Sequence, residues 1–306
     1  MKKNIYFAMA IAATALFAAC SSEDDAVTRV EEPQGITIIA NLPQGGITRV
    51  AYEETTSGST YGVKETWEST DKPKLYWTED ASTYKSGSYS VDVETGALSG
   101  FSKTPYTNSY LYLHYPNGLS SSYADGKLTI SPTGQANFIF ATINDVAAQN
   151  LLIGSFQYQT TADRTHVVEM QNAYALLKFS VKVPTTAAMT SKVEFGNAND
   201  AATGKGKMNL AQGSVALQEA NNPVWPPPAN PASSISKSIT LTLNAVAGSG
   251  TYKETTFYAL VIPQTFSKGL YLAVTAGGTE YKYVKAGSQT LEAGKMYGIK
   301  AVLSNP

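Results

Sequence analysis

Side chains that carry most enzymatic chemistry are scarce in this chain of 306 residues. Its histidines are His114 and His166, and its one cysteine is Cys20. His166 has no cysteine and no second histidine at the spacing that a zinc site uses. His114 lies in the aromatic run Tyr110–Tyr115, where a hydrogen-bonded structural histidine is commoner than a metal ligand. The sequence therefore predicts no metal site and implies no cofactor.

Nucleophile and phosphate-binding motifs are also missing from the sequence. It has no Gly-x-Ser-x-Gly elbow and no His-Glu-x-x-His pair. Gly204–Lys207 lacks the spacing and the Lys-Ser/Thr ending of a phosphate-binding loop, so a hairpin tip explains it better. A glycosidase needs two carboxylates across a cleft, but Glu53-Glu54 and Glu79-Asp80 adjoin turn signals, where acidic residues are solvated. We therefore expect a protein that is not an enzyme; a β-sandwich enzyme with a carboxylate pair is the third alternative.

Cys20 stands where a secretory signal would be cut. Lys2 and Lys3 open the chain, Ile5–Phe17 is almost wholly apolar, and small residues precede the cysteine, which is the order of a signal peptide. The apolar run is shorter than the roughly 20 residues that span a bilayer. The segment Leu16–Cys20 looks like a bacterial lipobox, in which the cysteine thiol receives a diacylglycerol and becomes the first residue.

The residues around the lipobox indicate where the lipid would hold the protein. We expect residues 1–19 to be a lipoprotein signal peptide and residues 20–33 to be an acylated acidic tether. Ser21–Asp25 resembles the serine-plus-acid tag that sends lipoproteins of Bacteroidetes-type bacteria to the outer face of the outer membrane. A periplasm-facing anchor is the alternative. The formal net charge of −1 and the lack of a basic patch argue against a nucleic-acid partner.

Almost everything after Val27 consists of short runs that end at Gly, Pro, Asn or Asp. Alternation of polar and apolar residues over four to eight positions is typical of half-buried strands, and 19 tyrosines suit pleated surfaces with one wet side. The strands expected in the first half are Ile36–Leu42, Leu75–Trp77, Ser88–Val93, Tyr110–Tyr115 and Lys127–Ile130. Those expected in the second half are Ala175–Val183, Ser238–Leu243, Thr256–Ile262, Leu270–Val274, Glu280–Val284 and Met296–Leu303.

Strands at this spacing indicate β-sandwiches rather than alternating α/β units. We expect an all-β protein with two sandwich domains in tandem, one over residues 34–167 and one over residues 168–306. Asp145–Asn150 is expected to form one short helical turn. Asn221–Pro231 is expected to be a rigid loop, because its prolines should block sheet pairing.

Six segments in order carry a resemblance that covers nearly the full length. They are the lipobox at Cys20, Ile47–Val50, Leu75–Asp80, Asn172–Phe179, Tyr258–Gln264 and Leu291–Tyr297. Each segment alone is weak evidence, but their order and spacing make the chain resemble the Bacteroidetes fimbrillin family, the lipoprotein subunits of type V pili. The resemblance implies that both domains are transthyretin-like β-sandwiches.

Stalk subunits of that family travel as lipoproteins and are then cut after an arginine by a trypsin-like protease. By the resemblance, the cut falls at Arg49-Val50 in this chain. The strand removed by this cut contains Ile36, Ile38 and Leu42. Arg29 is a second candidate, but it precedes that strand, so a cut there would free the lipid without opening a groove.

In the family, the C-terminal segment of another subunit then fills the opened groove. An incoming strand pairs free backbone groups and fills an apolar slot at once, and such a head-to-tail contact makes a filament. The donor residues implied here are Tyr297, Ile299, Val302 and Leu303. The short tail Ser304–Pro306 leaves open whether the chain is instead an anchor or tip subunit.

We therefore expect a structural or accessory subunit of a cell-surface fimbria that supports adhesion. It would be a surface-exposed outer membrane lipoprotein first and part of the fimbrium after processing. Its expected partners are other fimbrial subunits, an arginine-specific protease, the outer membrane through the lipid, and a receptor on a host or bacterial surface. The runner-up is a surface glycan-binding lipoprotein of a nutrient-uptake system. Such a protein needs exposed aromatic platforms flanked by Asn, Asp or Gln, and the tryptophans that could supply them are Trp67, Trp77 and Trp225.

Overall fold

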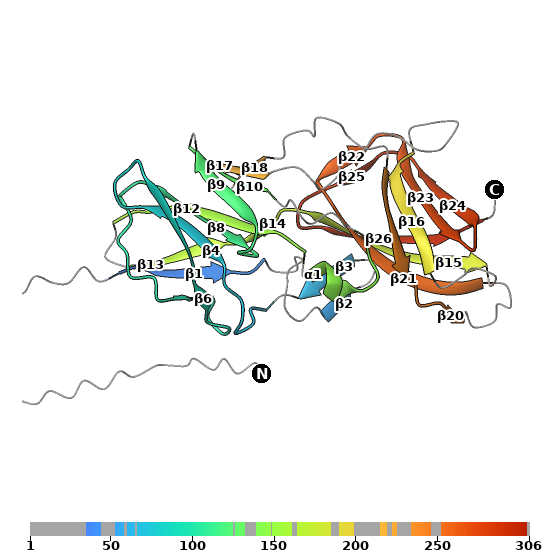
Figure 1. Ribbon diagram of the computed structural model, residues 1–306, viewed down its shortest axis with the longest axis horizontal. Coiled ribbons are helices and arrows are strands. Elements are labelled where there is room, and N and C mark those ends of the chain that lie inside the picture. Colours follow the sequence, from blue (N-terminus) through green and yellow to red (C-terminus); the bar gives the residue numbers. More distant parts are fainter. Residues whose placement is uncertain are drawn as a thin grey trace, which may run out of the picture. The chain divides into compact units, whose positions relative to one another are not determined.

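The computed structural model describes residues 35–43, 53–57, 60–64, 66–124, 126–131, 139–147, 149–160, 164–184, 190–198, 215–218, 222–224, 234–245 and 252–304 (Figure 1). All of them belong to one compact unit, Pro33–Pro306. Cys20, Arg49 and Val50 lie outside the described residues, as do the expected signal peptide and tether. Within the described ranges the chain is almost entirely strand with one short helix, which confirms the all-β expectation. No helix in these ranges has the length and apolar character needed to cross a membrane.

A five-stranded antiparallel sheet organises the first half of the unit. Its strands, in the order β14-β12-β8-β4-β5, are Gln171–Asn172, Leu152–Gln157, Tyr110–Tyr115, Lys74–Thr78 and Tyr84–Ser88. Three two-stranded pairs accompany it. They are β1 (Thr37–Asn41) with β13 (Thr165–Glu169), β2 (Glu53–Ser57) with β3 (Thr60–Lys64), and β6 (Ser90–Val91) with β7 (Leu98–Ser99).

The five-stranded sheet has a hydrophobic core on each face, because successive residues of a strand point to opposite sides. In β8, Leu111 and Leu113 enter the first core, while Tyr112 between them enters the second. We call the first the N-terminal core; it is built around Ile38, Leu75, Trp77, Leu111 and Leu113. The second, the middle core, is built around Tyr76, Tyr112, Leu176, Tyr258 and Leu260.

Two further sheets enclose the C-terminal core, which is built around Phe179, Phe195, Phe257, Phe266 and Leu272. The first sheet, in the order β11-β21-β15-β26, consists of Ile139–Phe140, Tyr252–Val261, Ala175–Pro184 and Met296–Val302, with β20 (Asn244–Ala245) also paired to β21. The second, in the order β19-β16-β23-β24, consists of Ser234–Thr240, Thr190–Asn197, Gly269–Ala276 and Thr279–Ala286. Strands β22 (Gln264–Phe266) and β25 (Gln289–Leu291) form a separate pair.

Strands from before residue 167 pair with strands from after it, in two separate sheets (Figure 1). Strand β11 of the first half joins the sheet of β21, and the short helix α1 (Ile143–Ala147) follows it. In return, β17 (Val215–Gln218) and β18 (Asn222–Val224) extend the hairpin of β10 (Lys127–Ser131) and β9 (Ser120–Ala124). The division into domains at residues 167 and 168 stays a prediction.

One expectation for the proline-rich segment was wrong. Asn222–Val224 forms β18, in which Pro223 stands opposite Leu217 of β17. The strand lies at the end of its sheet, and an edge strand tolerates proline because one side of its backbone needs no partner.

Candidate functional site

Strand β1 fills a slot in the N-terminal core. Ile36, Ile38 and Ala40 are buried, with 4%, 0% and 0% of their surface exposed, and the half-buried Leu42 packs against the same core. The intervening residues are half-buried or exposed. We call the space that Ile36–Leu42 occupies the first-strand slot. It accepts every second side chain of one short strand.

One edge of β1 pairs with β13 in parallel, in a register that runs from Thr37 opposite Thr165 to Asn41 opposite Glu169. The pairing is extended by Met170 N–H, which donates to Asn41 O at 2.9 Å. The Asn41 side chain donates to Glu169 Oε1, also at 2.9 Å. The strand therefore depends on a partner that follows it by more than a hundred residues.

The other edge of β1 meets the turn between β6 and β7. Ala40 N–H donates to Gly96 O at 2.9 Å, and the Trp67 indole N–H donates to Ala40 O at 2.8 Å. Gly96 has a φ of +73°, and a Cβ at this position would lie 2.7 Å from Ala40 O. Only glycine allows the turn to approach β1 this closely.

A cavity of about 450 Å³ lies where β1 ends. Asn41 and Leu42 line it together with Trp67, Glu94 and Glu169. Among the residues that the structure describes, the first-strand slot therefore adjoins this cavity at Leu42.

The last strand, β26, places alternate side chains in the C-terminal core, as β1 does in the N-terminal core. It is the edge strand of its sheet and pairs with β15 in parallel. Ile299, Ala301 and Leu303 are buried, and Tyr297 packs partly buried against the same core. Val302 points to the opposite face and is 54% exposed. Of the four expected donor residues, three therefore share the inward face and Val302 does not.

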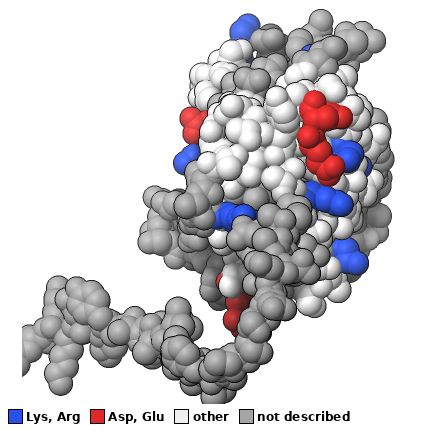
Figure 2. All heavy atoms as spheres, turned by 90° about the vertical axis from the view of Figure 1, so that its left-hand side faces the viewer, with Lys and Arg blue, Asp and Glu red and all other residues white. Residues whose placement is uncertain are grey.

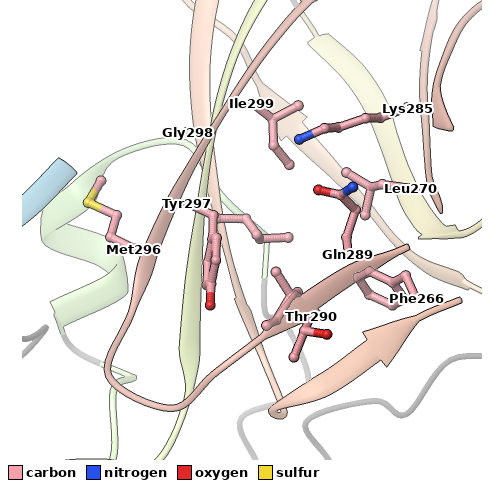
Figure 3. Close-up of a pocket in the computed structure, with 11 residues that line it drawn as sticks. Phe266, Leu270, Lys285, Gln289, Thr290, Met296, Tyr297, Gly298 and Ile299 are labelled. Carbon is pink, nitrogen blue, oxygen red and sulfur yellow. The ribbon is translucent and has the colours of Figure 1, made fainter. Parts of the chain in front are cut away.

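Packing beside β26 is incomplete. A pocket of about 340 Å³ opens between the first half of β26 and the elements that hold Phe266, Leu270 and Gln289 (Figure 3). Met296, Tyr297, Gly298 and Ile299 of β26 all line it. The Tyr297 hydroxyl accepts a hydrogen bond from Glu292 N–H at 2.9 Å, which ties the strand to the turn before it.

The inward residues of the two strands follow the same order of side chains. In β1 and its flanks these are Ile36, Ile38, Ala40 and Leu42. In β26 and the residue after it they are Tyr297, Ile299, Ala301 and Leu303. Three of the four positions carry the same residue type. The structure does not pair the two strands with each other: one lies beside β13 and the other beside β15.

Two of these inward residues, Ala40 and Ala301, were not among the expected site residues. The sequence indicates them only by their position. Each stands two residues after an isoleucine that is buried, and residues two apart in a strand point to the same face. Alanine is a weak hydrophobic marker, so a search for large apolar side chains passes over it.

The two histidines are both placed in the fold. His114 is fully buried, and its Nδ1 and Nε2 lie 3.0 Å from Pro116 O and 2.9 Å from Ser121 Oγ. His166 stacks on Phe156, with 5.3 Å between ring centroids. Among the described residues, no cluster of three metal-binding side chains occurs. Trp67 and Trp77 are buried in the N-terminal core, and Trp225 lies outside the described residues.

Comparison with known proteins adds to this picture at the level of the fold. No family model and no curated protein matches the chain. A candidate cell adhesion protein of Bacteroides ovatus matches with a TM-score of 0.53 at 14% identity, over 90% of this chain and 97% of that one. A candidate cell adhesion protein of Bacteroides uniformis gives 0.49 at 15% identity, over 85% and 95%. A fimbrial protein of Bacteroides ovatus gives 0.35 at 10% identity, over 90% and 52%. The chain therefore shares its fold with the first of these proteins.

Proposed function

We propose that the protein is a cell-surface subunit that supports adhesion, and that copies join when the last strand of one replaces the first strand of the next. The observation that carries this proposal is the matched series of inward side chains in Ile36–Leu42 and Tyr297–Leu303. A slot shaped for isoleucine, alanine and leucine at alternate positions suits a second segment with that series.

The match specifies a register. Ile299 takes the place of Ile38 and Ala301 that of Ala40, where Trp67 and Gly96 hold the backbone closely. Leu303 takes the place of Leu42, next to the 450 Å³ cavity. Tyr297 takes the place of Ile36 and is the one position where the incoming side chain is larger.

Backbone pairing favours the same arrangement. Both strands pair in parallel with their present neighbours, so β26 can offer β13 the hydrogen-bonding pattern that β1 offers now. Loss of β1 leaves the β13 edge unpaired and the apolar slot open, and an incoming strand removes both costs.

The donor strand must leave its own sandwich to do this. Its burial in the C-terminal core is lost, so the net gain depends on how well each site is packed. The 340 Å³ pocket beside Tyr297 and Ile299 means that the first half of β26 is incompletely packed on that side (Figure 3). We infer that this strand is easier to release than the strands paired on both edges.

In this proposal a trypsin-like protease cuts at Arg49-Val50 and releases β1, and acylation at Cys20 holds the protein at the outer membrane before the cut. Arg49 follows β1 in the chain, so cleavage there separates the strand from the rest of the unit. Because each copy gives one strand and receives another, the contact is head-to-tail and continues into a filament.

Cysteine cross-linking tests the register. In the proposed polymer Val302 takes the place of Asn41 and stands opposite Glu169 of the next copy. Neighbouring strands lie about 4.8 Å apart, within the Cα–Cα range of about 4.4–6.8 Å that a disulfide spans. We expect chains without Cys20 that carry Glu169→Cys or Val302→Cys to form a disulfide dimer when mixed after trypsin treatment.

Lys300→Cys is the matched control, since it would lie two residues out of register with Glu169→Cys and should cross-link poorly. N-terminal sequencing should show Val50 as the new terminus, and a sizing column should show oligomers that grow with concentration. A cleaved protein that stays monomeric, or equal cross-linking of both cysteine variants, would overturn the proposed exchange.

A further inference from the structure

A second pocket, away from the first-strand slot, is lined by tyrosines. It has a volume of about 400 Å³ and lies where the turn before β5, the start of β8, the end of β12 and strand β9 meet. Its aromatic residues are Tyr84, Tyr106, Tyr110, Tyr112 and Tyr123. Asn108 and Gln157 are among its polar residues, and no acidic or basic residue that the structure describes lines it.

The inner wall of this tyrosine pocket is rigid. Tyr84 and Tyr123 stack with 3.6 Å between ring centroids, and both pack beside the buried Tyr112. The Tyr84 hydroxyl donates to Tyr110 O at 2.8 Å. Rings held in this way present flat apolar faces that lose little entropy when a ligand binds.

The outer wall is held by backbone bonds around Asn108, whose φ of +66° is tolerated better by asparagine than by most residues. Asn108 N–H donates to Tyr158 O at 2.9 Å, and Tyr158 N–H donates to Ser109 O at 2.8 Å. The Gln157 side chain donates to Asn108 O at 3.1 Å. The loop that carries Tyr106 is therefore fixed to the end of β12.

Hydrogen-bonding groups at the mouth are left for a ligand. The hydroxyls of Tyr106, Tyr110 and Tyr123 and the side-chain amide of Asn108 make no hydrogen bond with any residue that the structure describes. Tyr106 is 48% exposed. A hydroxyl both donates and accepts, and an amide offers a donor pair and an acceptor.

We propose that the tyrosine pocket binds a neutral sugar ring, either a small saccharide or the end of a longer glycan. A sugar ring has an apolar C–H face that can lie on a tyrosine ring, and hydroxyls at its edge that match hydroxyl and amide groups. A volume of 400 Å³ falls at the lower end of the range of about 300–1,000 Å³ for ligand pockets. The part of the lining that the structure describes is uncharged, which does not suit an anionic or cationic ligand.

Figure 2 shows the face at the left-hand side of Figure 1. Uncharged side chains cover much of its described surface, and a group of acidic side chains with basic ones beside it lies in the right-hand part of the view. From the proposed function this inference takes only the location at the cell surface. It adds to that function the class of ligand that an adhesive protein of this kind would bind.

Sugar binding can be measured with the lipid-free chain by saturation-transfer NMR and calorimetry. The probes are galactose, mannose, fucose, glucose, N-acetylglucosamine and their common disaccharides, with choline and benzoate as charged comparisons. We expect saturable binding of at least one sugar and none of the charged probes. Binding of no sugar at millimolar concentration, or of choline in place of sugars, would overturn the proposal.

Two variants locate the site. Tyr106→Ala removes a half-exposed ring, and Asn108→Gly removes the amide while keeping a residue that accepts the positive φ. Each variant should raise the dissociation constant about tenfold, because the contact that it removes contributes about as much binding free energy as one hydrogen bond. Tyr283→Ala, on β24 in a sheet that encloses the C-terminal core, is the control and should leave binding unchanged. Equal affinity of all variants would place the sugar elsewhere and refute this pocket.

Strand exchange and sugar binding can be refuted independently of each other. Tyr106→Ala should not alter the Val302→Cys cross-link, because Tyr106 lines neither the first-strand slot nor the pocket beside β26. Cross-linking without sugar binding would leave strand exchange intact, and sugar binding without cross-linking would leave the tyrosine pocket intact.

Discussion

At the scale of single residues, His114 shows how a side chain that could do chemistry is built into the fold instead. Since a carbonyl can only accept, Nδ1–H donates to Pro116 O and Nε2 accepts from the Ser121 hydroxyl. Tyr76 O–H donates to Ser121 O at 2.9 Å. Burial lowers the pKa of His114 to about 4, and the charge of Lys74 acts in the same direction. The ring is therefore neutral at physiological pH and ties β8 to β9.

His114 should make stability depend on pH. Its folded pKa of about 4 lies below the ordinary value of 6.5, so between these values the unfolded chain binds a proton that the folded chain does not. Stability is therefore retained above pH 6.5 and falls by up to about 3 kcal/mol as the pH drops to 4. Urea unfolding of the wild type and of His114→Gln at pH 7, 5.5 and 4 checks this. Carboxylates contribute equally to both proteins, so parallel pH profiles would contradict the assignment.

At the scale of elements, β1 is held by two different kinds of contact. Parallel pairing with β13 fixes its register, whereas the turn at Gly96 fixes its depth through one close backbone approach to Ala40. A strand that is paired along one edge and touched at points along the other is the kind of element that can be replaced.

Gly96→Ala should loosen β1. The new Cβ would lie 2.7 Å from Ala40 O on a backbone with φ of +73°, and strain of this kind costs about 1–3 kcal/mol. Gly126→Ala is the matched control: its φ is +75°, but a Cβ there meets nothing within 4 Å. We expect Gly96→Ala to bind a labelled peptide of residues 296–304 more tightly than Gly126→Ala does, as measured by fluorescence anisotropy. Equal peptide affinity would show that Gly96 does not control the slot.

At the scale of the whole molecule, the middle core joins the two halves of the sequence. Tyr76 and Tyr112 from the first half pack in the same cluster as Leu176, Tyr258 and Leu260 from the second. The exchange of β11 and β17 between sheets adds backbone pairing to this contact. Regions that share a core in this way should unfold together.

Leu260→Ala tests that coupling. Leu260 is fully buried, and its truncation should cost about 2–5 kcal/mol. The buried Trp67 and Trp77 report on the N-terminal core through their fluorescence. We expect the tryptophan unfolding transition to shift to lower urea together with the circular dichroism transition. A tryptophan transition that stays in place would mean that the two halves unfold independently.

Much of the fold follows from local pattern. Alternation in Ile36–Leu42 and in Met296–Leu303 predicted strands that the structure confirms as β1 and β26. The same period of two places Val302 on the face opposite to Ile299, and the structure shows Val302 exposed there; its place in a donor strand stays a prediction. Processing at Arg49 and acylation at Cys20 are predictions of another kind, since they rest on motifs alone.

Only the tertiary structure decided which strands pair and which distant side chains form a pocket. Side chains alternate between the two faces of a strand, so the sequence by itself determined that Ile36, Ile38 and Leu42 share one face of the first strand, as Tyr297, Ile299 and Leu303 do in the last. Pairing depends instead on contacts between distant segments, and β1 beside β13 joins residues 128 positions apart. The tyrosine pocket likewise collects Tyr84, Tyr106, Tyr123 and Gln157 from four separate segments. No window of sequence contains such a site, because it exists only after those segments have packed.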